Sequence, residues 1–286
     1  MAKAMAVCKD NFRRLFSSPK IYVMFILIVI MLDSMMIGAI RSMAEDMDLK
    51  IAPWLYPFLP SNAYICMLEA LGAVFLLCDV PMVNHGTPYI FVRSGRRAWL
   101  VGQIIYVVLA GLLYQLLFLL SSVLLILPRL EFTWHWGKVI GSLALTDIGA
   151  EYGAELSSIF VRQFMPAQAM LISFSLRWMV DVLLGMLILS MNLFLPRILG
   201  TIIGGVVALL HPTAINASGT TLFYFSPSSW TVVDYINFSG ANGIRTVSLF
   251  PKLSYIWTVG PIVIALLIGL SICGFRRKSI YSLSTL

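Results

Sequence analysis

The run Gln168–Phe194 reads QAMLISFSLRWMVDVLLGMLILSMNLF, and only two of its 27 residues, Arg177 and Asp181, carry a charge. A helix needs about 20 consecutive, mostly apolar residues to cross the hydrocarbon core of a bilayer. This run exceeds that length. It therefore predicts a transmembrane helix, and it makes a membrane the natural solvent for the whole chain.

Further apolar runs lie on both sides of this one. They predict spans at Ile21–Ile40, Asn62–Val83, Ala98–Leu127, Arg197–Leu210 and Tyr255–Phe275. Asp33 interrupts the first of these. The run from Arg197 is short, so we expect it to extend into the following stretch or to break within it. The sequence thus predicts an all-α membrane protein with six transmembrane helices.

Composition supports the same class of protein. Of the 286 residues, 59% are hydrophobic and 12% are Asp, Glu, Lys or Arg, whereas a soluble domain carries about 25% charged residues. The net charge of +7 comes from basic residues at the ends of apolar runs, which favours a membrane surface over nucleic acid. No linker or repeat divides the chain, so residues 1–286 are expected to form a single transmembrane domain.

The basic residues also predict the orientation, because cytoplasmic segments carry an excess of Lys and Arg. With a cytoplasmic N-terminus, six spans place these basic residues inside: Lys3, Lys9, Arg13, Arg14, Lys20, Arg93, Arg96, Arg97, Arg197, Arg276, Arg277 and Lys278. Only Asp10 and Asp79 accompany them, whereas the outer segments hold seven basic and eight acidic residues. We therefore expect a protein of the plasma membrane with both termini in the cytoplasm.

Two segments outside the spans have their own patterns. In Met1–Ser18 the apolar Met5, Cys8, Phe12, Leu15 and Phe16 share one helical face, with Lys9 and Arg13 opposite. This predicts an amphipathic interface helix, with a frayed tail as the alternative. His211–Ser254 is apolar and aromatic but broken by prolines and glycines. Irregular backbone cannot face lipid, so this segment is predicted to be re-entrant or interfacial and covered by protein.

Two other outer stretches are longer than simple turns. Ser42–Ser61 contains three prolines around Trp54 and Tyr56, which is typical of an extended loop anchored at the membrane interface. Pro128–Met165 is mixed in charge and long enough to hold a helix.

Charged side chains inside predicted spans are costly and are candidates for function. They are Asp33, Glu69, Arg177 and Asp181. Arg177 and Asp181 are four residues apart, so they share a helical face and could pair. These residues could line a polar path or form a conformational latch. The alternative is that they only hold the helices together.

Small residues form a second candidate feature. Gly200 and Gly204 make a G-x-x-x-G pair, which lets two helices approach closely. The pattern fits a dimer face and an intramolecular contact equally well.

The loop between the second and third predicted spans, Asn84–Arg97, reads NHGTPYIFVRSGRR. Four apolar residues, from Tyr89 to Val92, lie between Gly-Thr-Pro and a basic cluster. Apolar residues on a short basic loop indicate docking into the groove of a partner protein. The alternative is a loop that lies on the lipid surface with its arginines on phosphate groups.

Motifs for enzymatic chemistry are absent from the sequence. There is no G-x-x-x-x-G-K-[ST], no H-E-x-x-H and no G-x-S-x-G. The four cysteines contain no C-x-x-C pair, so we expect free thiols rather than a disulfide framework or a zinc site. No catalytic residue and no metal ligand is predicted.

The chain resembles the membrane subunits of type-2 ATP-binding-cassette (ABC) transporters, the exporter-type permeases. Gly86-Thr87 and Arg93–Leu100 resemble the coupling-helix loop of that family, and Tyr224–Trp230 resembles a Tyr-x-Ser-Pro-x-x-Trp stretch found in some bacterial members. The basic amphipathic start, six helices and internal termini agree with it. Many members carry Glu just before the Gly-Thr, where this chain has Asn84 and His85.

This resemblance implies that separate subunits carry out transport and ATP hydrolysis. The permease binds no nucleotide, and separate P-loop ATPase subunits bind ATP and Mg²⁺ and drive export through two permease chains, identical or similar. The residues that would contact the ATPase are Gly86, Thr87, Tyr89, Phe91, Arg93, Arg96 and Arg97. The implied substrate is a peptide or antimicrobial compound. The alternatives are an ion-coupled secondary transporter, and a membrane sensor or assembly factor that transports nothing.

Overall fold

The computed structural model describes residues 1–83, 87–146, 148–154, 156–216, 221–238 and 250–277. The regular structure of these residues is helical, apart from two isolated bridges that pair Ile51 with Leu130 and Asn237 with Lys252. The longer helices are α1 (Ala2–Ser17), α2 (Pro19–Leu32), α4 (Ala63–Leu77), α6 (Arg96–Ile126), α10 (Pro166–Phe194), α11 (Arg197–Ala208) and α14 (Leu253–Arg277).

Shorter helices cap and connect these. They are α3 (Gly38–Asp46), α5 (Thr87–Ser94), α7 (Gly137–Leu145), α8 (Ile148–Glu151), α9 (Ser158–Gln163), α12 (Leu210–Asn216) and α13 (Leu222–Phe225). The tighter or wider helical turns are η1 (Asp33–Ile37), η2 (Tyr56–Ser61), η3 (Leu127–Arg129), η4 (Pro227–Thr231) and η5 (Val233–Tyr235).

Five helical stretches of the described residues are long and apolar enough to cross a membrane. They are Pro19–Asp46, Arg96–Arg129, Pro166–Phe194, Ile198–Asn216 and Leu253–Arg276. Large apolar side chains such as Ile26, Ile202 and Leu266 are exposed on the outer faces of α2, α11 and α14. The fold is therefore that of an all-α, multi-pass membrane protein. The predicted span Asn62–Val83 contains only the 15-residue α4, about 22 Å long.

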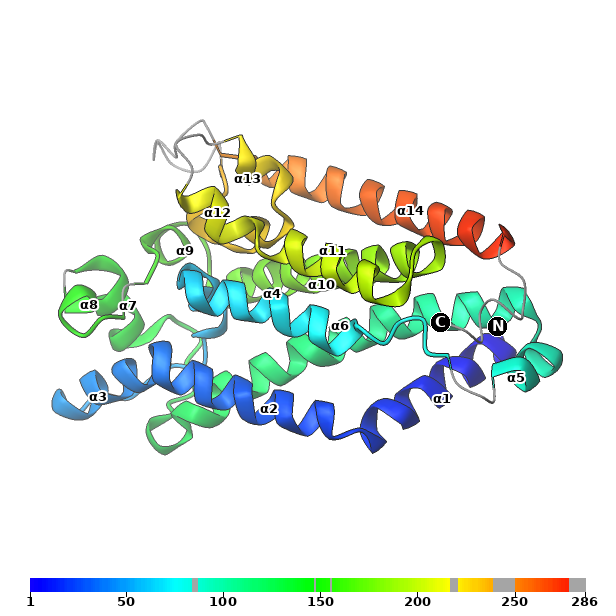
Figure 1. Cartoon of the computed structure of the whole chain (residues 1–286). Helices are drawn as coiled ribbons and strands as arrows, with labels where there is room; N and C mark the ends of the chain where they lie inside the picture. The colour runs from blue at the N-terminus through cyan, green and yellow to red at the C-terminus, as the bar shows by residue number, and fades with distance from the viewer. Residues whose placement is uncertain (84–86, 147, 155, 217–220, 239–249, 278–286) are drawn as a thin grey trace.

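Helix α10 lies at the centre of the bundle. It contacts α4, α6, α11 and α14, as well as the turns η2 and η4, and side chains around its whole circumference are buried. The helices run roughly side by side (Figure 1). Because α10 packs against four of the long helices, its side chains set the spacing between them.

The two ends of the bundle differ. Helices α1 and α5 and the C-terminal end of α14 lie together at one end, on the right in Figure 1. Helices α3, α7, α8, α12 and α13 lie at the other. Helix α1, helix α5 and the last turn of α14 therefore lie at the same end of the bundle.

Helix α1 packs against α6 through a face that differs in part from the predicted one. Its buried residues are Ala4, Val7, Cys8, Asn11 and Leu15. Met5 and Phe16, predicted to share that apolar face, are about half exposed. Two contacts explain the difference. Gly102 of α6 lets Val7 and Ala4 approach closely, and Asn11 Nδ2 donates to Gln103 Oε1 at 3.1 Å.

Two span boundaries extend beyond the apolar runs. The hydroxyl of Ser18 accepts a hydrogen bond from Lys20 N and caps α2, and Pro19 occupies its first turn. The helix passes Asp33 through the wider turn η1 and continues as α3 to Asp46. At the other interrupted run, α11 is followed almost directly by α12, so the helical stretch reaches Asn216, as expected for a run that was too short.

The outer stretches are packed rather than extended. In η2 the residues from Tyr56 to Pro60 are buried, and Trp54 Nε1 donates to the carbonyl of Thr133 at 2.8 Å. The expectation that Trp54 and Tyr56 anchor a loop at the lipid interface is therefore wrong for Tyr56, which lies in the protein core. Pro128–Met165 contains α7, α8 and α9. The described part of His211–Ser254 holds α12, α13, η4 and η5, and residues 217–220 and 239–249 lie outside the described residues.

The G-x-x-x-G pair makes a contact within the chain. A methyl group added at Gly200 would lie 2.0 Å from Asn192 Oδ1 and 2.9 Å from Asn192 N. At Gly204 it would lie 2.8 Å from Ile188 Cγ1. Both neighbours belong to α10. The two glycines therefore let α11 approach α10, whereas Gly205 has open space beside it.

We predict opposite effects for two alanine substitutions on α11. Gly200→Ala should destabilise the protein by about 1–3 kcal/mol, because the new methyl group overlaps α10. Gly205→Ala adds the same methyl group in open space and should be neutral or slightly stabilising, because alanine favours helix by up to about 1 kcal/mol over glycine. Thermal unfolding of the two variants in detergent measures the difference. Equal melting temperatures would contradict the α10–α11 contact.

Candidate functional site

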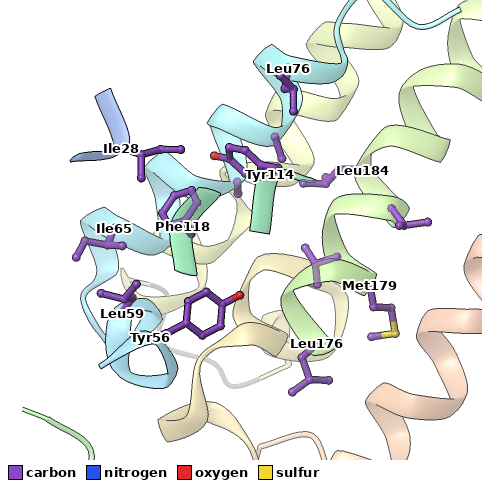
Figure 2. Packing of buried hydrophobic residues seen from close by; sticks show 14 of the residues in the cluster. Ile28, Tyr56, Leu59, Ile65, Leu76, Tyr114, Phe118, Leu176, Met179 and Leu184 are labelled. Atoms are coloured by element: carbon purple, nitrogen blue, oxygen red, sulfur yellow. The ribbon is translucent and has the colours of Figure 1, made fainter. Parts of the chain in front are cut away.

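Charged and polar side chains meet in the centre of the bundle, in the protein interior. The cluster consists of Tyr56 from η2, Glu69 from α4, Gln115 from α6, and Arg177 and Asp181 from α10. Arg177 is 0% exposed, Glu69 5% and Asp181 2%. Figure 2 shows Tyr56, Tyr114 and Phe118 gathered between α4 and α10 in the same region. We call Tyr56, Glu69, Gln115, Arg177 and Asp181 the core cluster.

Hydrogen bonds join the five residues into one network. Arg177 Nε donates to Glu69 Oε1 at 2.6 Å, and Arg177 Nη1 donates to the carbonyl of Tyr56 at 3.2 Å. Gln115 Nε2 donates to Glu69 Oε1 at 2.9 Å and to Asp181 Oδ2 at 2.7 Å. The Tyr56 hydroxyl donates to Gln115 Oε1 at 2.8 Å. Three helices and one outer turn are thereby linked through polar groups.

Aromatic rings surround the guanidinium group. Arg177 Cζ lies 4.1 Å from the centroid of the Tyr56 ring and 5.2 Å from that of Phe118. A cation over an aromatic face is stabilised by about 2 kcal/mol or more when water is excluded.

The pair Arg177–Glu69 crosses between helices, from α10 to α4. The sequence had suggested a partner within the same helix. Although Asp181 shares a face with Arg177, no direct bond joins them among the described contacts, and Asp181 is reached through Gln115. The physical reason is that α4 brings a carboxylate against the guanidinium, while α6 brings an amide against Asp181.

Two atoms of this pair remain without a hydrogen-bond partner in the described structure, Glu69 Oε2 and Arg177 Nη2. Each buried polar atom left unpaired costs about 1–3 kcal/mol. The core cluster therefore forms although two of its buried polar atoms lack a hydrogen-bond partner.

Two residues of the core cluster, Gln115 and Tyr56, were not among the site residues predicted from the sequence. Gln115 is an uncharged amide in the middle of the long run Ala98–Leu127, and Tyr56 belongs to a segment expected at the lipid interface. A buried amide in a membrane helix needs polar partners. The rule that marks charged residues inside predicted spans as candidates, once extended to amides, would therefore also have marked Gln115.

Asp33 lies apart from the core cluster. Its carboxylate is 3.1 Å from the guanidinium of Arg41, two turns further along the same helical stretch, and both side chains are partly exposed. It sits at the start of η1, where the helix is wider. Wider turns of this kind inside α-helices occur frequently at functional sites. The structure thus divides the four predicted charges into a core group of three and one residue near the surface.

The loop predicted to contact an ATPase contains a helix. Helix α5 is followed by Gly95, whose φ of +86° favours glycine, and α6 starts at Arg96. Tyr89 is 75% exposed, and Arg93 and Arg97 are exposed. Arg96 Nη2 instead donates to the carbonyl of Phe275 at 3.0 Å, which ties α6 to the end of α14. Gly86 and the side chains of Thr87 and Phe91 lie outside the described residues.

Cysteine and metal chemistry give no further site. All four cysteines are free thiols, with Cys8 and Cys66 buried and Cys273 exposed. The described residues contain no group of three or more His, Cys, Asp or Glu side chains that could hold a metal ion.

No protein-family model matches the chain, and neither a curated protein nor a solved structure is significantly similar to it.

Removal of the guanidinium from the core cluster should be strongly destabilising. In Arg177→Met the Glu69 carboxylate stays buried without its partner, a change that typically costs about 3–5 kcal/mol. The double variant Arg177→Met/Glu69→Gln removes both charges and should recover most of the lost stability. Thermal unfolding in detergent measures both. If the double variant were no more stable than Arg177→Met, the direct ionic pairing would not be the source of the effect.

Proposed function

We propose that this chain is the membrane subunit of an ABC exporter. Its substrate moves outward with energy from ATP, which a separate P-loop ATPase subunit hydrolyses with Mg²⁺. The single observation that supports this most is α5, a short helix with an exposed aromatic ring and exposed arginines between α4 and α6. An apolar side chain such as Tyr89, extending beyond a basic surface, fits insertion into a groove on a partner protein.

Six spans and cytoplasmic termini complete this proposal. Helix α4 alone is shorter than the hydrocarbon core of about 30 Å. The buried turn η2 precedes it, and Val80 and Pro81 after it are also buried. Non-helical backbone is tolerated at membrane depth where protein covers it. We therefore take η2, α4 and residues 78–83 together as the sixth span, which places the basic end with α1 and α5 in the cytoplasm.

The segment from α12 to η5 fits the proposed re-entrant role for the same reason. Ser226–Val233 are buried, η4 contacts α10, and Trp230 Nε1 donates to the carbonyl of Phe223 at 3.0 Å. In the stretch Tyr224–Trp230, whose resemblance suggests a peptide or antimicrobial substrate, Phe225 is 74% exposed, and the buried part is Ser226–Trp230. In the proposed exporter it closes the outer end of the bundle beside α10.

The core cluster offers a route from the coupling helix to the bundle. Helix α5 connects α4 to α6 along the chain, and Glu69 and Gln115 of the core cluster belong to those two helices. A displacement of α5 would move both flanking helices and change the hydrogen bonds to Arg177 and Asp181 on α10. In this proposal the cluster is the latch that holds one arrangement.

A second permease chain would cover the exposed apolar face of α2. Asp33 lies on this helical stretch, partly exposed, and a charged group facing lipid is costly. A second copy, packed against α2, would remove Asp33 and Arg41 from lipid and place them beside the path between the two chains.

Cysteine labelling tests the topology. In a background without native cysteines, Lys9→Cys and Arg97→Cys should react with a membrane-impermeant maleimide only after cells are permeabilised. Glu131→Cys and Glu151→Cys, at exposed positions at the other end, should react in intact cells. The opposite pattern would exclude a cytoplasmic ATPase at α5, and labelling of Lys9→Cys and Arg97→Cys on different sides would exclude the even number of spans.

Disruption of the coupling surface tests the function itself. Tyr89→Asp should abolish co-purification of a P-loop ATPase in mild detergent while the melting temperature stays unchanged, because the exposed ring contributes little to folding. Trp134→Asp is the matched control, since Trp134 is 73% exposed at the other end. If no ATPase co-purifies with the unaltered chain, or if Tyr89→Asp retains it, the proposed coupling is wrong.

A further inference from the structure

A groove of about 590 Å³ runs between α1 and α5. Its walls carry both charged and apolar side chains. The charged ones are Lys3, Asp10 and Arg14 from α1 and Arg93 from α5, and the apolar ones include Val7 and Ile90. The groove therefore joins a cationic rim to an apolar floor, a combination that matches a molecule with an anionic head and an apolar tail.

Two of the basic residues that line the groove have no ion-pair partner among the described residues. Asp10 forms an ion pair with Arg14, one turn along α1. Lys3 and Arg93 lie on the two helices that form the groove, and neither makes an ion pair among the described residues. Two unneutralised cations contributed by opposite walls attract an anion, and an arginine binds phosphate oxygens with two parallel hydrogen bonds.

The position of the groove suggests where the anion comes from. Helix α1 is amphipathic, and its half-exposed Met5 and Phe16 suit insertion into the headgroup region of a membrane. The groove lies at the basic end of the bundle, with α1 and α5. Anionic phospholipids attract basic residues next to a membrane span, whereas free phosphate would leave the apolar floor uncovered.

We propose that this groove binds an anionic phospholipid, with its phosphate between Lys3 and Arg93 and the start of an acyl chain along Val7 and Ile90. The bound lipid would fasten α1 to α5 and so fix the position of α5 relative to the bundle. This inference depends on the membrane location of the chain and not on the proposed exporter function.

The purified full-length chain in mild detergent tests the proposal by native mass spectrometry with phosphatidylglycerol and with phosphatidylcholine of the same acyl chains. The unaltered protein should retain phosphatidylglycerol preferentially. Lys3→Gln/Arg93→Gln should weaken this binding about tenfold or more, since each basic residue contributes to the attraction. Lys9→Gln/Arg13→Gln removes the same charge from α1 and Lys9 and Arg13 do not line this groove, so it should bind normally.

Three outcomes would overturn the proposal. Equal loss in both double variants would show diffuse attraction to a basic surface. Equal retention of phosphatidylcholine would remove the role of the anionic head. Competition by inorganic phosphate at the same concentration as the lipid would identify a free-phosphate site. The melting temperature of each variant is compared first, and Lys3→Arg/Arg93→Lys, which keeps both charges, should bind the lipid even if the glutamine variant is less stable.

Discussion

The ion pair between Arg177 of α10 and Glu69 of α4 is the constraint on which the rest of the bundle depends. A guanidinium group that is removed from water must find a carboxylate and further acceptors. Arg177 satisfies this requirement with Glu69, the carbonyl of Tyr56 and two aromatic rings. Helix α4 and the turn η2 are thereby held against the central helix, although the 15 residues of α4 are fewer than those of each of the five helical stretches long enough to cross a membrane.

The same pair explains why the outer turn before α4 is buried. Tyr56 donates its hydroxyl hydrogen to Gln115 and stacks on Arg177, so η2 must enter the bundle rather than remain at the membrane surface. Gln115 then connects Glu69 to Asp181. Because α4 and α6 also flank α5, this polar network is connected by the chain itself to the exposed helix at the basic end.

The two surfaces that we propose to bind other molecules both lie at the basic end of the bundle. In the two proposals, α5 would present Tyr89 to a partner protein, and the groove between α1 and α5 would present Lys3 and Arg93 to a lipid phosphate. The two surfaces share one short helix. A lipid in the groove and an ATPase at Tyr89 would therefore act on the same element, and the hydrogen bond from Arg96 to the carbonyl of Phe275 ties the start of α6 to the end of α14 beside them.

The sequence by itself determined the all-α, multi-pass membrane fold, and it indicated that the short run from Arg197 would extend or break beyond Leu210, because both depend on local apolarity and length. It also identified three of the five residues of the core cluster, since charges inside apolar runs stand out in the sequence. Only the tertiary structure decided that Arg177 pairs with Glu69 rather than Asp181, that Tyr56 is buried, that Met5 and Phe16 face outward and that Gly200 and Gly204 contact α10. Each of these depends on the rotation of one helix against another, and that rotation is set by side chains far apart in the sequence.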